Sequence, residues 1–195
     1  MQTDDEIIQD VIRGRTDRYE AILKRYQHSL LNFIHKMVQD RDEAENLSQD
    51  VFVKVFSSLR KYHRQGNFRA FLFTVAKNMS LNHLKRQRRN IPLSWIEKPG
   101  MENTAFQLSP EQDSVYDQEH RDRLLLDALK SLRENQRIAL ILKIYLEFSY
   151  KQISQITGWS VPKIETLISR AKRNLQAWLQ VQEREKNRVN IVRGR

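Results

Sequence analysis

Glycine and proline are scarce in this chain, and their scarcity limits the possible folds more than any other feature. The 195 residues contain only five Gly and four Pro. A sheet-rich fold of this size needs many tight turns, which depend on such residues. Leu, Lys, Arg, Glu and Gln are abundant instead, and all of them favour helices. The sequence therefore predicts an all-α protein.

Three of the four prolines lie in one stretch, residues 91–110, that has no helical periodicity. Its sequence, IPLSWIEKPGMENTAFQLSP, is typical of a linker. Ser, Pro and Glu at 109–111 then form a favourable helix start, with an N-cap, a first-turn proline and a first-turn acid. The predicted organisation is a helical domain at 1–90, a flexible linker at 91–108, a second helical domain at 109–180 and a basic tail at 181–195. For the end of the tail, from Lys186, the sequence predicts only disorder or attraction to phosphate.

Apolar residues in the first domain recur every three or four positions, as in amphipathic helices. Thr3 and Glu6 have the spacing of a capping box, which predicts a first helix that ends before Gly14. Thr16 begins a second, longer helix, and a third starts near Asp42. A fourth helix is expected at 68–90.

Positive charge is concentrated in two blocks. The formal net charge is +10, from 34 Lys and Arg against 24 Asp and Glu. Residues 61–90 contain eight Lys and Arg and no acid, and residues 123–180 carry a net charge of +6, whereas residues 91–122 carry −5. Two basic blocks separated by an acidic stretch indicate two modules that each bind a polyanion such as DNA.

Several protein classes find no support in the sequence. The absence of Cys excludes disulfides and thiolate metal sites. The N-terminus, MQTDDEIIQD, lacks the blocks of a signal peptide, and no apolar run approaches the roughly 18 residues of a membrane span, so a cytoplasmic protein is expected. The five His have no ligand spacing, and no phosphate loop or nucleophile motif occurs. The sequence thus predicts no cofactor, no metal, no small-molecule substrate and no enzymatic activity.

Residues 149–175, SYKQISQITGWSVPKIETLISRAKRNL, have the form of a helix-turn-helix, preceded by a very apolar helix at 138–146. Gly158 marks the turn, and Ile164, Ile168 and Ala171 fall on one side of the second helix. The opposite side is basic and hydroxyl-bearing, which suits a helix in a major groove, although a solvated surface helix has a similar pattern. The candidate DNA contacts are Lys151, Ser160, Lys163, Thr166, Arg170 and Arg173.

The helix expected at 68–90 combines an apolar stripe with a basic end. Phe68, Leu72, Val75 and Met79 face the preceding helices, while Phe73 falls on the far side. Polar and basic residues of this helix can donate to the DNA backbone and base edges. The loop before it is a hypothetical pocket for an extruded base, because stacking and amide hydrogen bonds can offset unstacking. The candidate contacts are Tyr62, His63, Arg64, Gln65, Asn67, Phe68, Lys77, Asn78, Asn82, Lys85 and Arg86.

In order and spacing, these segments resemble a bacterial alternative sigma factor of the extracytoplasmic-function (ECF) type, in the sigma-70 family. Such proteins keep only the second and fourth conserved sigma regions, joined by a linker, and the resemblance covers roughly 4–90 and 109–180. Residues 42–56, DEAENLSQDVFVKVF, are similar to the segment that grips the clamp coiled coil of the RNA polymerase largest subunit. Residues 66–89 are similar to the promoter-melting and minus-ten-reading segment. Residues 149–175 are similar to the minus-thirty-five-reading helix-turn-helix, and ALKSLRENQRIALIL upstream matches its support helices.

The resemblance implies a role in transcription initiation. The chain is expected to bind core RNA polymerase and direct it to promoter DNA, and an anti-sigma factor is a further expected partner. The residues expected to bind polymerase are Glu45, Leu47, Gln49, Asp50, Phe52 and Val53. The chain departs from the family pattern at Phe71, Arg133, Glu165 and Leu167. The last two leave the exact promoter contacts open, since an acid near phosphate is repelled.

Two other functions remain as alternatives. A free-standing helix-turn-helix regulator would explain the C-terminal half, but it leaves residues 42–89 without a task. A small nuclease could hold a metal with Asp40, Asp42 and Glu43, but the chain has no second acidic cluster in a basic setting.

Overall fold

The computed structural model describes residues 2–62, 67–89 and 115–193, and over these residues it forms helices and no strand. The N-terminal unit contains α1 (Asp4–Ile12), α2 (Tyr19–Val38), α3 (Arg41–Ser58) and α4 (Phe68–Arg89), with 3-10 turns at Thr16–Arg18 and Leu59–Lys61. The C-terminal unit contains α5 (Val115–Lys130), α6 (Glu134–Leu140), a π-helical turn (Ile141–Tyr145), α7 (Tyr150–Thr157) and α8 (Val161–Arg193). The predicted all-α class is confirmed. The predicted linker at 91–108 and the helix start at 109–111 lie outside the described residues.

The capping box and the glycine that bound the first helix adopt the conformations that the sequence predicts. Thr3 Oγ1 accepts the backbone N–H of Glu6 at 3.3 Å, and the Glu6 carboxylate accepts that of Thr3 at 2.9 Å, so the capping box is confirmed. Gly14 follows α1 with φ of +100°, a conformation in which a side chain would be strained. The second helix begins at Thr16 as a 3-10 turn and becomes α-helical only at Tyr19.

Asp40 sets the start of α3. Its carboxylate accepts the backbone N–H of Glu43 at 2.9 Å, which satisfies one of the free donors of the first turn. The helix therefore begins at Arg41, close to the predicted start. This capping contact also gives Asp40 a structural role in place of the metal-binding role that the nuclease alternative assigns to it.

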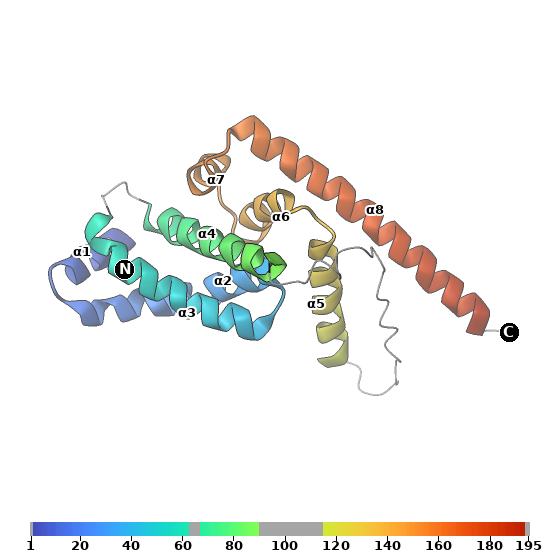
Figure 1. Cartoon of the computed structure of the whole chain (residues 1–195), viewed down its shortest axis with the longest axis horizontal. Helices are drawn as coiled ribbons and strands as arrows, with labels where there is room; N and C mark the ends of the chain where they lie inside the picture. The colour runs from blue at the N-terminus through green and yellow to red at the C-terminus, as the bar shows by residue number, and fades with distance from the viewer. Residues whose placement is uncertain (1, 63–66, 90–114, 194–195) are drawn as a thin grey trace.

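The two units share one apolar core. The ring of Phe73 on α4 lies between Phe33 of α2, at a centroid distance of 5.5 Å, and Phe148 of the C-terminal unit, at 5.4 Å. Both contacts are edge-to-face, an arrangement that adds stabilisation beyond burial alone. In Figure 1, α7 lies beside α4 of the N-terminal unit, and the π-helical turn contacts α2. The two predicted domains are thus packed against each other in this structure.

The helix-turn-helix forms as predicted. Ser149 and Gln152 make a capping box at the start of α7, with contacts of 2.9 and 3.3 Å. Gly158 ends α7 in the left-handed region, with φ of +74°, and its N–H donates to Ser154 O at 2.8 Å. The inward apolar residues are buried: Ile153, Ile156, Ile164, Ile168 and Ala171.

The last helix is longer than the sequence analysis expected. It continues to Arg193 and extends beyond the rest of the molecule in Figure 1. The disorder predicted from Lys186 is therefore wrong up to Arg193. The physical reason is that residues 176–193 contain no Gly or Pro and are rich in Gln, Glu and Arg, which favour the helix. None of the helices in the described ranges is both long and apolar enough to cross a membrane.

Candidate nucleic-acid interface

The outer face of α3 combines polar and apolar side chains that are open to solvent. Glu45, Gln49, Asp50 and Val53, here called the α3 face, are all exposed, because they lie opposite the buried Ala44, Val51 and Val55. Val53 is 69% exposed. An apolar side chain that stands out among polar ones in this way is suited to a protein contact. The α3 face can therefore present a charged, an amide and an apolar group to one partner.

Two of the predicted polymerase-binding residues are covered by the protein, one wholly and one in part. Leu47 is buried in the core. Phe52 is half-buried, and its carbonyl accepts the hydroxyl of Tyr19 at 2.9 Å. These residues position α3 rather than present a surface, because the hydrophobic side of the helix faces α2 and α4.

Tyr62 forms one wall of an aromatic cluster just before α4. Its ring centroid lies 5.9 Å from that of Phe68 and 5.2 Å from that of Phe71, and its hydroxyl donates to Asp5 at 3.2 Å. Burial, with a smaller effect of the Asp5 charge, raises the pKa of Tyr62 to about 12. The hydroxyl is therefore protonated at neutral pH, and the side chain is partly buried against the core.

Phe68 does not present its ring to solvent, although the sequence analysis placed it in the base pocket. It is 2% exposed, because its ring packs against Tyr26 and Tyr62 in the core. In this conformation the ring cannot stack on a base. His63, Arg64 and Gln65, predicted for the same pocket, lie outside the described residues.

Asn67 is placed by two hydrogen bonds. Its side-chain oxygen accepts the backbone N–H of Ala70 at 3.1 Å, so Asn67 caps the N-terminus of α4. Its amide nitrogen donates to Gln155 of α7 at 3.2 Å. The side chain thus links the start of α4 to the helix-turn-helix.

The predicted minus-ten residues on α4 fall into two groups. Asn78, Asn82, Lys85 and Arg86 are exposed and leave their donors open to solvent. Lys77 is only 9% exposed, and its ammonium donates to the carbonyl of Ile156 in α7 at 2.9 Å. In this conformation Lys77 cannot contact DNA, because α7 covers it. Burial also lowers the pKa of the Lys77 ammonium.

The outer side of α8 carries the predicted basic stripe. Lys163, Thr166, Arg170 and Arg173 are exposed, opposite the buried apolar residues of the same helix. Lys163 lies over the ring of Trp159, and its ammonium is 5.2 Å from the centroid of that ring. Lys151 and Ser160 are also exposed, at the start of α7 and just before α8. These positions leave all six predicted residues free to reach a duplex.

Glu165 and Leu167, the two residues of α8 that depart from the family pattern, differ in their exposure to solvent. Leu167 is half-buried and packs on the core, so it does not lie on the exposed basic stripe. Glu165 is exposed close to that stripe. Of these two residues, Glu165 is the one that brings negative charge near the basic stripe.

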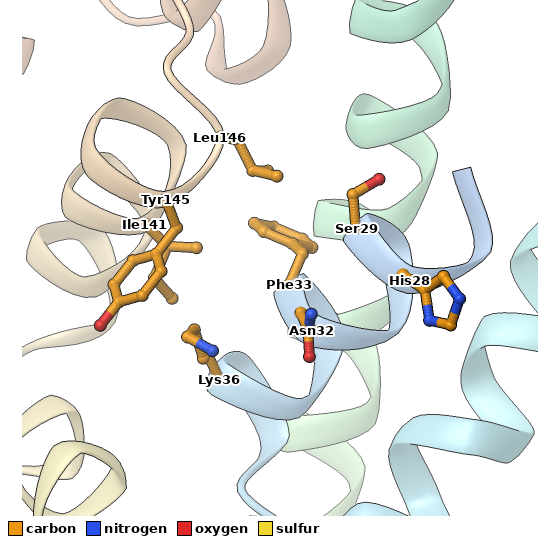
Figure 2. A pocket seen from close by; sticks show the side chains of 8 residues that line it. All are labelled: His28, Ser29, Asn32, Phe33, Lys36, Ile141, Tyr145 and Leu146. Carbon is orange, nitrogen blue, oxygen red and sulfur yellow. The ribbon is translucent and has the colours of Figure 1, made fainter. Parts of the chain in front are cut away.

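A pocket of about 310 Å³ separates α2 from the π-helical turn of the C-terminal unit (Figure 2). Phe33 projects from α2 toward the π-helical turn, and the ammonium of Lys36 lies 4.7 Å from the ring centroid of Tyr145. The π-helical turn interrupts the apolar helix expected at 138–146, since Leu146 N–H donates to Ile141 O, five residues back. The pocket is lined by His28, Ser29, Asn32, Phe33, Lys36, Ile141, Tyr145 and Leu146.

Sequence reasoning missed two arginines that join the units. Arg137 donates to the carbonyls of Met37 at 2.9 Å and Leu132 at 3.3 Å, and Arg69 donates to the carbonyl of Leu146 at 2.6 Å. For Arg137 a signal was present, because it is a charged residue directly before the apolar run IALIL. For Arg69 no signal was present, because it lies in a segment where every charge is basic.

Comparisons with known proteins agree with this arrangement. The family model described as Sigma-70 region 2 matches residues 22–90, and that described as Sigma-70, region 4 matches residues 122–175. An ECF RNA polymerase sigma-E factor of Escherichia coli (strain K12) is 25% identical over 175 residues, covering 87% of this chain and 91% of that protein. The chain belongs to the sigma-70 family, in its ECF group. Region 2 of this sigma factor includes α2, α3 and α4, so a helix-turn-helix regulator without region 2 is not favoured.

Other relatives extend over nearly the whole chain. The RNA polymerase sigma factor YlaC of Bacillus subtilis (strain 168) is 27% identical, over 89% of this sigma factor and 98% of YlaC. The structure of the sigma factor RpoE from Bartonella quintana, in complex with the anti-sigma factor NepR, matches with a TM-score of 0.63 and 26% identity, over 84% of this chain and 97% of RpoE. CnrH, in complex with the cytosolic domain of CnrY, shares the fold with a TM-score of 0.71 and 17% identity, over 92% and 99% of the two chains.

Proposed function

We propose that this sigma factor binds core RNA polymerase through the α3 face and directs it to promoters. The segment around α4 reads and opens the minus-ten element, and α8 reads the minus-thirty-five element. The observation that carries the proposal is that three separate exposed surfaces, one acidic and apolar and two basic, lie on the helices of regions 2 and 4. Catalysis belongs to the polymerase, and the sigma factor supplies position and specificity.

The α8 stripe supports the minus-thirty-five assignment. A helix whose buried side is apolar and whose open side carries Arg, Lys and Thr can lie in a major groove, where Arg reaches guanine edges and Lys reaches phosphates. We expect Arg170→Ala to weaken binding of the holoenzyme to its promoter by about 1–3 kcal/mol and to relax discrimination at one base pair. Promoter-binding measurements with single base-pair changes would detect this loss.

Lys163→Ala is the matched comparison on the same stripe. If Lys163 contacts a phosphate, its loss should weaken all sequences alike and lower the slope of log K against log salt by about 1. Unchanged promoter binding in both variants would mean that the recognition surface lies elsewhere on the molecule.

The cluster around Tyr62 and Asn67 supports base capture during promoter opening. Stacking of one base is worth about 1–3 kcal/mol, so Tyr62→Leu and Asn67→Ser should reduce run-off transcription from a duplex promoter about tenfold. Serine keeps an N-cap acceptor for α4 and removes only the amide. A template with a pre-opened minus-ten bubble should restore most of the activity. Equal losses on the duplex and the pre-opened template would contradict base capture.

An anti-sigma factor is the second proposed partner. The Bartonella quintana RpoE, 26% identical to this chain, was solved with the anti-sigma factor NepR. The pocket between α2 and the π-helical turn is a place where an apolar side chain of such a protein could insert, because Phe33 and Tyr145 line it on opposite sides.

The alternative of a free-standing DNA-binding regulator makes a different prediction. Such a protein would shift promoter DNA in a gel without polymerase, whereas a sigma factor would direct initiation only in the presence of core enzyme. Run-off transcription with core polymerase on a library of genomic fragments tests the proposal directly. Absence of any specific start site would contradict it.

A further inference from the structure

The turn of the helix-turn-helix holds one side chain, that of Trp159, in a fixed place. The Trp159 backbone N–H donates to Thr157 Oγ1 at 3.2 Å, and its carbonyl accepts the hydroxyl of Ser154 at 2.6 Å. The side chain is partly buried and packs on the apolar core. Trp159 therefore has little freedom to move, because both its backbone and its ring are held by neighbouring residues.

Lys163 lies against this fixed ring. Its ammonium is 5.2 Å from the centroid of the Trp159 ring, within the range of a cation–π contact. Long side chains in a helix lean toward the helix N-terminus, so Lys163 reaches back over the turn rather than along the middle of α8. In docked helix-turn-helix motifs the helix before the turn crosses the DNA backbone. The Trp159 ring therefore directs the ammonium toward phosphate rather than toward base edges.

Lys163 carries the positive charge of the first part of α8. Residues 161–169, VPKIETLIS, contain no other Lys or Arg, and the next basic residue is Arg170. Glu165 is exposed in the same stretch, and its carboxylate repels a nearby phosphate. Among the side chains of these nine residues, attraction to the DNA backbone thus depends on Lys163.

A contact that holds Lys163 in the free protein favours binding. Fixing a flexible lysine side chain costs conformational entropy, because its four-carbon stem has many rotamers. A side chain that already lies close to its bound position loses less entropy when the partner arrives. The gain is an increase in affinity without any new contact to the DNA.

We infer that Trp159 is a positioning residue for the promoter contact of Lys163, because its ring holds the ammonium in place before DNA binds. The DNA contact of Lys163 rests on the proposed function, whereas the contact between the two side chains is a property of the free chain. Trp159→Leu keeps an apolar side chain on the core and removes the aromatic ring. It should weaken promoter binding by the holoenzyme about threefold, the size of an exposed cation–π contact.

A double-mutant cycle separates positioning from packing. In a Lys163→Ala background, Trp159→Leu should cause no further loss, because no ammonium remains to be held. Trp159→Phe keeps an aromatic ring and should restore part of the affinity. Fluorescence anisotropy of a promoter fragment, titrated with holoenzyme at several salt concentrations, measures each value. The slope of log K against log salt should fall only when Lys163 is removed, since Trp159→Leu leaves the charge in place.

Leu175→Ala is the matched packing control. Leu175 is also partly buried on the same core, but it lies about three helical turns beyond Lys163. Any loss caused by weaker packing should be the same with and without Lys163. If Trp159→Leu behaves in this way, or leaves binding unchanged while Lys163→Ala weakens it, the inference is overturned and the proposed function stands.

Nuclear magnetic resonance of the free protein tests the contact without DNA or polymerase. Protons over the face of an indole ring are shifted upfield by its ring current, so the Cε methylene signal of Lys163 should be shifted in spectra of isotope-labelled lysine. Trp159→Leu should return this signal to the position of an exposed lysine such as Lys172. An unshifted Lys163 signal in the wild type would overturn the inference. Unchanged promoter binding in both Lys163→Ala and Arg170→Ala would contradict the proposed minus-thirty-five contact, and with it the positioning role, even where the ring contact is observed.

Discussion

Asp50→Arg is expected to abolish co-purification of this sigma factor with core RNA polymerase. Asp50 is exposed on the α3 face, next to Gln49 and one turn before Val53, which is the most exposed apolar residue there. Reversing its charge places like charges opposite each other if the partner surface is basic, which costs several kcal/mol. A loss of roughly 3 kcal/mol raises the dissociation constant more than 100-fold. Affinity capture of core enzyme, followed by titration, would measure the change.

Asp127→Arg is the matched control. Asp127 is an exposed acid on α5, away from the α3 face, so its reversal makes the same change in net charge. This variant should bind polymerase like the wild type. Helical circular dichroism should be unchanged in both variants, because neither side chain is buried. Full binding by Asp50→Arg would exclude the α3 face as the polymerase contact.

Phe73→Ala is expected to lower the free energy of unfolding by about 3–5 kcal/mol. Phe73 is 0% exposed, and its ring makes edge-to-face contacts with Phe33 and Phe148. Truncation removes the buried area and leaves a cavity between α2, α4 and the C-terminal unit. Guanidinium unfolding followed by circular dichroism would measure the loss.

Phe56→Ala serves as the comparison for this prediction. Phe56 is 41% exposed and has one edge-to-face contact, with Tyr19 at 5.0 Å. Its truncation should cost less than half as much, since much of the ring is already in water. Phe73→Leu, which keeps most of the apolar volume, should also lose less than Phe73→Ala. Equal, small losses for Phe73→Ala and Phe56→Ala would show that the two units do not share the Phe73 core.

The helices and their ends were predictable because their causes are local. The capping box of Thr3, the left-handed Gly158 and the apolar stripe of α8 depend on residues within one or two helical turns. The continuation of α8 to Arg193 was missed because the positive charge of the tail received more weight than its lack of helix breakers. The π-helical turn at Ile141–Tyr145 was missed because apolar periodicity does not distinguish it from an α-helical turn.

The candidate site was predictable only in part. The α3 face and the α8 stripe follow from helical spacing, since buried residues on one side leave the others exposed. Leu47, Phe68 and Lys77 belong to the same motifs, but the structure buries them. A motif identifies which residues accompany a function, and it does not separate those that contact a partner from those that hold the helix in place.

The sequence by itself determined the all-α class, the two basic blocks and the helix-turn-helix, because each depends on composition or on spacing within a single helix. Only the tertiary structure decided which side of α4 remains open to solvent. Lys77 is covered by a carbonyl 79 positions away, and Arg137 is held by one 100 positions away. Such contacts depend on how two helical units pack, and no local pattern specifies that arrangement.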